Sequence, residues 1–109
     1  MEITVRNEQQ ALVVAVVGRL DGMTTPEFDR QSSAWVKPGQ RLVLDLSQLN
    51  YISSAGLRSI LALGKQMKAA GGALGLSGLS GLVEEVISLS GFNTILPIYS
   101  DVASALKSV

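Results

Sequence analysis

The fold is decided by the stretch Asp45–Leu57, which reads DLSQLNYISSAGL. The segment Arg41–Leu46, which is rich in apolar residues, predicts a buried strand that runs into this stretch. After it, apolar or small residues recur at i, i+3, i+4, i+7 and i+10, which predicts an amphipathic helix. The residues of that stripe are Leu57, Ile60, Leu61, Gly64 and Met67. Two serines and two small residues therefore lie where a strand passes into a helix.

The start of this helix is suited to an anion. The first turn of a helix leaves backbone N–H groups unpaired and carries the positive end of the helix dipole. A phosphoryl group on Ser53 or Ser54 would be held by these groups. Ala55 and Gly56 keep the helix start bare, so that the active site of another protein could reach the hydroxyl. The structural alternative is that serine acts only as an N-cap, and residue types alone favour it.

Strands and helices alternate on both sides of this stretch. Thr24-Thr25-Pro26-Glu27 predicts a helix start, with a threonine cap, proline in the first turn and Glu27 in capping-box register with Thr24. Phe28, Trp35 and Val36 continue it, and Lys37-Pro38-Gly39 ends it. We expect further strands at Ile3–Val5, Ala11–Val17, Ala73–Leu76 and Ile95–Tyr99, and further helices at Ser80–Ser90 and from Ser100. The inward residues of those two helices are expected to be Val83, Val86, Ile87, Val102, Ala103 and Leu106.

This order predicts one α/β domain over residues 1–109. Strands that alternate with helices form a mostly parallel sheet, and the hairpin between the first two strands adds an antiparallel edge strand. The expected architecture therefore has five strands and four helices. A chain of 109 residues can bury about two-thirds of the surface that its unfolded form exposes, which is enough for one core.

The composition excludes most of the chemistry of small enzymes. The chain has no Cys and no His, so it lacks thiolate nucleophiles, the commonest general base and the commonest metal ligands. No glycine-rich phosphate loop follows a strand. Nine basic and nine acidic residues give a net charge of zero, which argues against general binding of nucleic acid. We expect no catalytic residue, metal or cofactor.

No segment is expected to enter a membrane. The longest apolar stretch, Ala11–Val17, has seven residues, whereas about 20 are needed to cross a bilayer. The first residues do not form a signal peptide. We therefore expect a cytoplasmic location.

The stretch Asp45–Leu57 resembles the signature of STAS domains, specifically the stand-alone bacterial anti-sigma-factor antagonists. Their pattern is a strand ending in Asp-Leu-Ser, a spacer, an aromatic-aliphatic pair, and then Asp/Ser-Ser-Ser/Thr/Ala-Gly-Leu. Two weaker matches are Gly18-Arg19-Leu20-Asp21 followed by Thr24, and Leu89-Ser90-Gly91-Phe92. The element order is also that of the family, so the resemblance covers essentially the whole chain.

The resemblance implies a partner switch in which the chain catalyses nothing. Such proteins bind an anti-sigma factor, usually a serine kinase, and so free a sigma factor. The kinase phosphorylates a serine, which falls on Ser54 here, and a PP2C-type phosphatase reverses the modification. Many members have Asp at the position of Ser53, which leaves Ser53 as a rival acceptor. The alternative is a STAS accessory subunit of an ABC-type lipid or anion transport system.

The contact surface for the partner is expected around Ser54. We expect Leu57 and Arg58 or Leu61 to lie partly at the surface, as an apolar anchor with a charged rim. The switch needs a free face, so we expect a monomer at working concentrations. The expected partner-binding residues are Asp21, Ser53, Ser54, Gly56, Leu57, Arg58 and Leu61.

Overall fold

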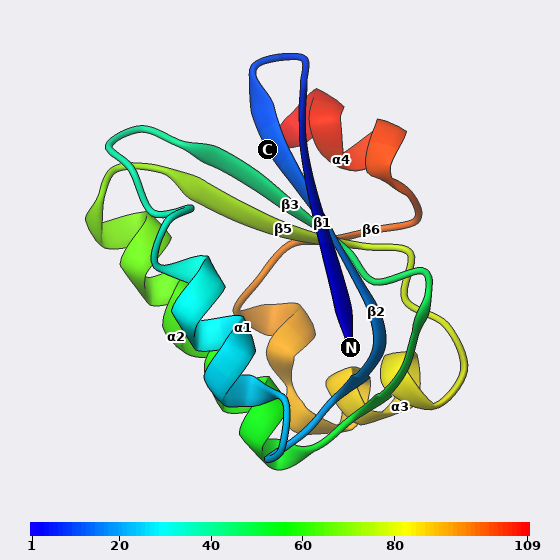
Figure 1. Ribbon diagram of the computed structural model, residues 1–109. Coiled ribbons are helices and arrows are strands. Elements are labelled where there is room, and N and C mark those ends of the chain that lie inside the picture. Colours follow the sequence, from blue (N-terminus) through cyan, green and yellow to red (C-terminus); the bar gives the residue numbers. More distant parts are fainter.

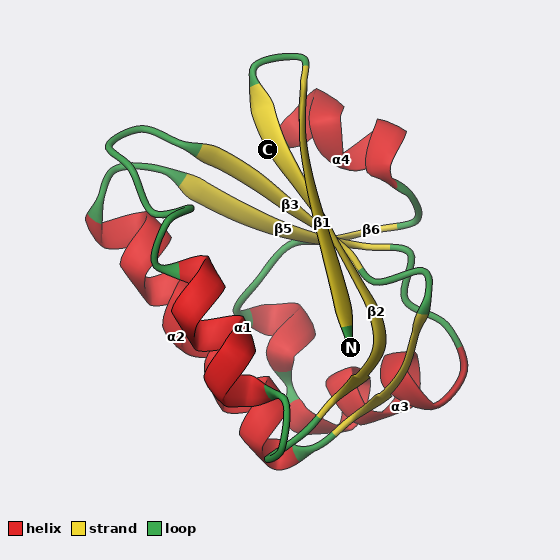
Figure 2. Cartoon of the chain, viewed as in Figure 1, coloured by secondary structure: helices red, strands yellow, loops and turns green.

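A twisted sheet forms the centre of the molecule, and the computed structural model describes all of residues 1–109 (Figures 1 and 2). The strand order is β1-β2-β3-β5-β6, and β4 pairs with β2. β1 is antiparallel to β2, and every other pair is parallel. The strands are β1 (Glu2–Glu8), β2 (Ala11–Leu20), β3 (Arg41–Asp45), β4 (Leu49–Ile52), β5 (Ala73–Ser77) and β6 (Ile98–Tyr99).

The helices cover the two faces of the sheet unequally. Three of them, α1 (Thr25–Ser32), α2 (Ser54–Ala69) and α3 (Gly81–Ser90), lie on one face, together with the short 3₁₀ helix η1 (Phe92–Thr94) (Figure 1). They enclose the larger core cluster of 19 buried residues. The fourth helix, α4 (Val102–Ser108), lies on the other face over a cluster of five buried residues. The prediction of one α/β domain with four helices and a mostly parallel sheet is confirmed.

The sheet has six strands where the sequence predicted five. The additional strand is β4, which pairs with Gly18, Arg19 and Leu20 at the end of β2. β3 pairs with β2 only over Leu12–Ala15, so the backbone groups at the end of β2 need another partner. β4 supplies it, after a register shift between Gly18 and Arg19. The chain therefore enters the Ser53 region as a paired strand rather than as a loop.

The helix start at Thr24 forms differently from the predicted capping box. The Thr24 hydroxyl accepts from the N–H of Asp21 at 2.9 Å and donates to the carbonyl of Arg19 at 3.0 Å. Glu27 pairs instead with Arg30, one helical turn further on. α1 ends at Ser32, before Trp35 and Val36, although Trp35 is buried in the core. The predicted helix was therefore too long at its C-terminal end.

Two predictions near the C-terminus were also wrong in detail. β6 has two residues instead of five, because the N–H groups of Ile95 and Leu96 bond back to the carbonyl of Phe92 in the turn after η1 and Ile95 is exposed to solvent. The Asp101 carboxylate caps α4 by accepting from the Ser104 N–H at 2.8 Å, so α4 begins at Val102. This start turns Ala105 and Leu106 toward the sheet and leaves Ala103 exposed. In contrast, α3 ends as predicted at Gly91, whose φ of 81° suits glycine.

Candidate functional site

Ser53 is the N-cap of α2, and its hydroxyl oxygen and backbone N–H are both engaged in hydrogen bonds. Its backbone is extended, with φ −97° and ψ 175°, and its hydroxyl oxygen accepts from the N–H of Gly56 at 3.3 Å. Its own N–H donates to the carbonyl of Leu20 at 3.0 Å. Ser53 therefore fastens the start of α2 to the end of β2.

Ser54 is the first residue of α2, and its side chain is free. The residue is exposed, and its hydroxyl makes no hydrogen bond within the chain. The neighbouring Ala55 is partly buried and adds only a methyl group beside it. The two adjacent serines thus differ in kind: one hydroxyl is engaged in the helix cap, and the other faces solvent at the positive end of a helix.

Gly56 allows α2 to lie against the ends of β2 and β4. A Cβ atom at this position would lie 2.6 Å from the carbonyl oxygen of Leu20 and 2.8 Å from Cγ1 of Ile52. The first of these atoms belongs to the backbone and cannot rotate away. Glycine is therefore required here by close packing, and it fixes the position of Ser54 relative to the sheet.

Asp21 organises the loop between β2 and α1, directly after Leu20. Its carboxylate accepts from the N–H groups of Met23 at 3.0 Å and Thr24 at 3.2 Å, and it pairs with Nε of Arg19 at 3.4 Å. Desolvation alone would raise the pKa of the Asp21 carboxyl. These donors and the Thr24 hydroxyl outweigh it, so the pKa lies below its ordinary value. Asp21 thus holds the loop in shape, which leaves the Met23 side chain 90% exposed at its tip.

Arg19 also stacks on an aromatic ring that the sequence analysis did not assign to the site. Its guanidinium carbon lies 4.2 Å from the centroid of Tyr51, its partner residue in β4. This contact joins the end of β2 to the strand that leads into Ser53. Only the pairing of β2 with β4 brings these residues together, so no local sequence pattern could have identified the contact.

The exposed side of α2 beside Ser54 is mixed in character. Leu57 and Leu61 are each partly buried and pack on the edge of the core, while Arg58 is exposed. The arrangement leaves two apolar side chains accessible one turn apart, with a cation next to them.

An apolar stripe on α3 was missed by the sequence analysis. Leu82 is 49% exposed and Leu89 is 82% exposed, and the partly buried Val86 lies between them at i+4 and i+7 spacing. α3 packs on β4, so this stripe lies on the same side of the sheet as α2. Val86 packs against the core as predicted, so the exposed part of the stripe is formed by Leu82 and Leu89, whose i, i+7 spacing was the available signal.

The structure contains no group of three or more His, Cys, Asp or Glu side chains that could hold a metal ion. None of its helices combines the length and apolar character needed to cross a bilayer.

Comparisons with known proteins agree with this architecture. The protein BtrV of Bordetella bronchiseptica, which bears the name of an anti-sigma factor antagonist, is 36% identical over 99 residues, covering 90% of this chain and 85% of that protein. The anti-sigma F factor antagonist of Paenibacillus polymyxa is 28% identical over 111 residues, covering 100% and 95%. The crystal structure of an anti-sigma factor antagonist from Mycobacterium paratuberculosis has a TM-score of 0.90 at 27% identity, covering 99% of this chain and 92% of that one.

The family model of the STAS domain matches residues 2–105, which is nearly the whole of the described fold. The match includes the Asp45–Leu57 stretch and the β2–α1 loop, on which the resemblance was based. The chain belongs to the STAS domain family.

Proposed function

We propose that this chain is an anti-sigma-factor antagonist that acts in the cytoplasm as one component of a partner switch. Unphosphorylated, it binds an anti-sigma factor that is also a serine kinase, and the sigma factor is released. The kinase transfers phosphate to Ser54, which ends the interaction, and a PP2C-type phosphatase restores it. The relatives named as anti-sigma factor antagonists support this role.

The observation that carries the proposal is the difference between the two serines. A phosphate acceptor must present a free hydroxyl to the active site of the kinase. The Ser54 hydroxyl is exposed and unpaired, whereas the Ser53 hydroxyl accepts from the N–H of Gly56. Ser54 is therefore the better acceptor, and Ser53 serves the fold.

Phosphate on Ser54 is expected to leave the fold intact. It adds about 1.5 to 2 negative charges at pH 7 to a chain with no net charge. At the N-terminus of α2 this charge is favoured by about 0.3–1 kcal/mol. Phosphorylation should therefore act on binding and leave the structure of the domain nearly unchanged.

The surface around Ser54 explains how a phosphate would oppose binding. Leu57 and Leu61 on α2 offer apolar anchors, and Arg58 offers a charged rim. A partner that covers Ser54 would have to desolvate the phosphate against a surface fitted to a hydroxyl. A cost of about 1.4 kcal/mol already weakens binding tenfold, and an unmatched dianion should cost more.

In this role the chain is a ligand and a substrate of other enzymes. Its activity requires a free face around Ser54, so we propose that it acts as a monomer. Asp21 contributes indirectly, because it shapes the loop that carries the exposed Met23.

The test is affinity purification of the wild-type chain and of three variants from the source cells, followed by phosphosite mapping and calorimetry with the captured kinase. Ser54→Ala should retain the kinase even with ATP present, and Ser54→Asp should bind at least tenfold more weakly than wild type. Ser53→Ala is the matched control and should still be phosphorylated.

Two results would contradict the proposal. Modification of Ser54→Ala but not of Ser53→Ala would assign the acceptor to Ser53. Capture of an ABC-type ATPase in place of a kinase would favour the transport alternative.

A further inference from the structure

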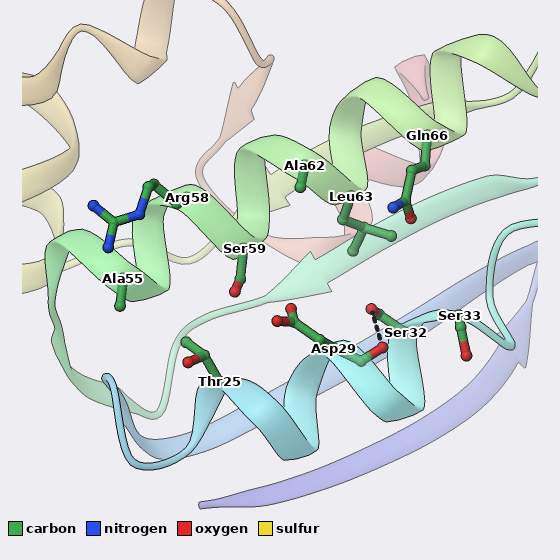
Figure 3. A pocket seen from close by; sticks show the side chains of 10 residues that line it. All are labelled: Thr25, Asp29, Ser32, Ser33, Ala55, Arg58, Ser59, Ala62, Leu63 and Gln66. Carbon is green, nitrogen blue, oxygen red and sulfur yellow. Dashed lines mark hydrogen bonds between the residues drawn. The ribbon is translucent and has the colours of Figure 1, made fainter.

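A groove of about 540 Å³ separates α1 from α2 and is distinct from the apolar surface on α3 (Figure 3). Thr25 and Asp29 of α1 form one wall, and Ser59 and Gln66 of α2 form the other. Ala62 adds only a methyl group to the α2 side, so the groove stays wide enough to admit a side chain. Its size is in the range of sites that bind small ligands or single large side chains.

Asp29 is exposed and places an unpaired negative charge along the α1 wall of the groove. Its carboxylate points across toward the hydroxyl of Ser59 and forms no ion pair with any residue of the chain (Figure 3). Neither Arg30, its neighbour in sequence, nor Arg58, which also lines the groove, forms an ion pair with it. Arg30 pairs with Glu27, and the guanidinium of Arg58 points away from Asp29 at the far end of the groove (Figure 3).

Two nearly buried hydroxyls open into the same groove. Thr25 and Ser59 are each only 9% exposed, and neither side chain makes a hydrogen bond within the chain. No buried side-chain oxygen or nitrogen of the chain lacks a hydrogen-bond partner, so these two hydroxyl oxygens are open to the groove and free to bond a ligand that enters it. They flank the Asp29 carboxylate, one on each helix.

We propose that this groove binds a positively charged side chain, the guanidinium of an arginine or the ammonium of a lysine, presented by the anti-sigma partner. A carboxylate only accepts hydrogen bonds, so its ligand must be a donor, and a cation also satisfies its charge. A guanidinium carries five donors in a planar fork, which can engage Asp29 in a bidentate pair and still reach the Ser59 and Thr25 oxygens.

The position of the groove links it to the switch. Ala55, which follows Ser54, lines one end of the groove, so the groove opens toward the proposed phosphate acceptor. The assignment of the cation to the anti-sigma partner rests on the proposed function. The affinity of the groove for a guanidinium does not depend on the proposed function, so this affinity and the identity of the partner can be tested separately.

The experiment is a two-dimensional NMR titration of the ¹⁵N-labelled chain with N-acetyl-arginine amide. The uncharged isostere N-acetyl-citrulline amide serves as the control ligand. The arginine probe should give saturable shifts at the amides of Thr25, Asp29, Ser59 and Leu63, and the citrulline probe should bind at least tenfold more weakly. Asp29→Asn should weaken the arginine probe at least tenfold, and Ser59→Ala should weaken it several-fold. Glu84→Gln removes an exposed helical carboxylate outside the groove and should change nothing.

Equal binding of the two probes, shifts outside the groove, or an unaltered affinity of Asp29→Asn would overturn the proposal. The assignment to the partner is tested with Asp29→Lys, which should reduce capture of the kinase at least tenfold and leave the fold intact, as judged from its NMR spectrum. If the probe binds but Asp29→Lys captures the kinase normally, the partner does not supply the cation. A failure of the Ser54 test leaves the probe titration unaffected, so the two failures are distinguishable.

Discussion

The requirement for glycine at position 56 can be tested against a second glycine in the same helix. Both Gly56 and Gly64 are buried in α2, and replacing either with alanine should add about 1 kcal/mol through higher helix propensity. The two sites differ in what the new methyl group meets. At Gly56 the nearest atom is the backbone oxygen of Leu20 at 2.6 Å, and at Gly64 it is a terminal methyl of Leu96 at 2.8 Å.

The expected magnitude follows from these contacts. Real Cβ atoms essentially never lie closer than 3.0 Å to another heavy atom. The Cβ of alanine at position 56 must therefore move at least 0.4 Å away from the Leu20 oxygen. The same carbonyl accepts from the N–H of Ser53, so the movement weakens that hydrogen bond. Overpacking costs about 1–3 kcal/mol and a lost hydrogen bond about 1 kcal/mol, against the gain of about 1 kcal/mol. Gly56→Ala should therefore lower the free energy of unfolding by about 1–3 kcal/mol.

Gly64→Ala should be nearly neutral or slightly stabilising, because the Leu96 side chain can rotate away from the new methyl group. The assay is urea denaturation of both variants, supported by thermal melting, in which each 1 kcal/mol corresponds to roughly 4–8 °C. If Gly56→Ala is as stable as wild type, or if Gly64→Ala is the more damaging of the two, the close-packing argument is wrong.

Three further predictions concern the surroundings of the site. Ser53→Ala should lower the free energy of unfolding by about 1 kcal/mol in urea, because it removes the cap on the Gly56 N–H, while Ser54→Ala should change it by a few tenths. The pKa of Asp21 is below its ordinary 3.8, so the stability that it contributes is complete above that pH and is lost as the pH falls through the lowered value. An NMR titration of the carboxyl should show this midpoint, and Thr24→Val should move it upward. Arg41→Met should speed hydrogen exchange in α4, because Arg41 donates to the carbonyls of Gln9, Leu106 and Val109.

Much of the fold could be predicted because local patterns and tertiary structure agree in this chain. The helical spacing of apolar residues from Leu57 to Met67 correctly predicted the helix α2. Gly91 was expected to end α3, and it does. β4 could not be predicted, because four residues give almost no periodicity and its existence depends on the unpaired end of β2. Likewise, the end of α1 depends on where Trp35 enters the core rather than on the helical spacing before it.

The site was only partly accessible to sequence reasoning. Ser53 and Ser54 both precede the helix, so residue types could not tell which one caps it. That difference depends on the extended backbone of Ser53, which turns its hydroxyl toward Gly56. The groove was out of reach, since Asp29 and Ser59 belong to different helices and approach each other only when α1 and α2 dock on the same face of the sheet.

The local structure around Ser54 explains why a modification there is compatible with a stable fold. The contacts that hold α2 against the sheet belong to its neighbours: Ser53 supplies the cap and the bond to Leu20, and Gly56 allows the close approach. Ser54 contributes no hydrogen bond through its side chain, so its hydroxyl can be exchanged for a phosphate without removing any of them. The same rigid neighbours fix where that phosphate would lie. The proposed switch therefore needs no conformational change in this chain, because the added charge alone alters a surface whose position is set by Ser53 and Gly56.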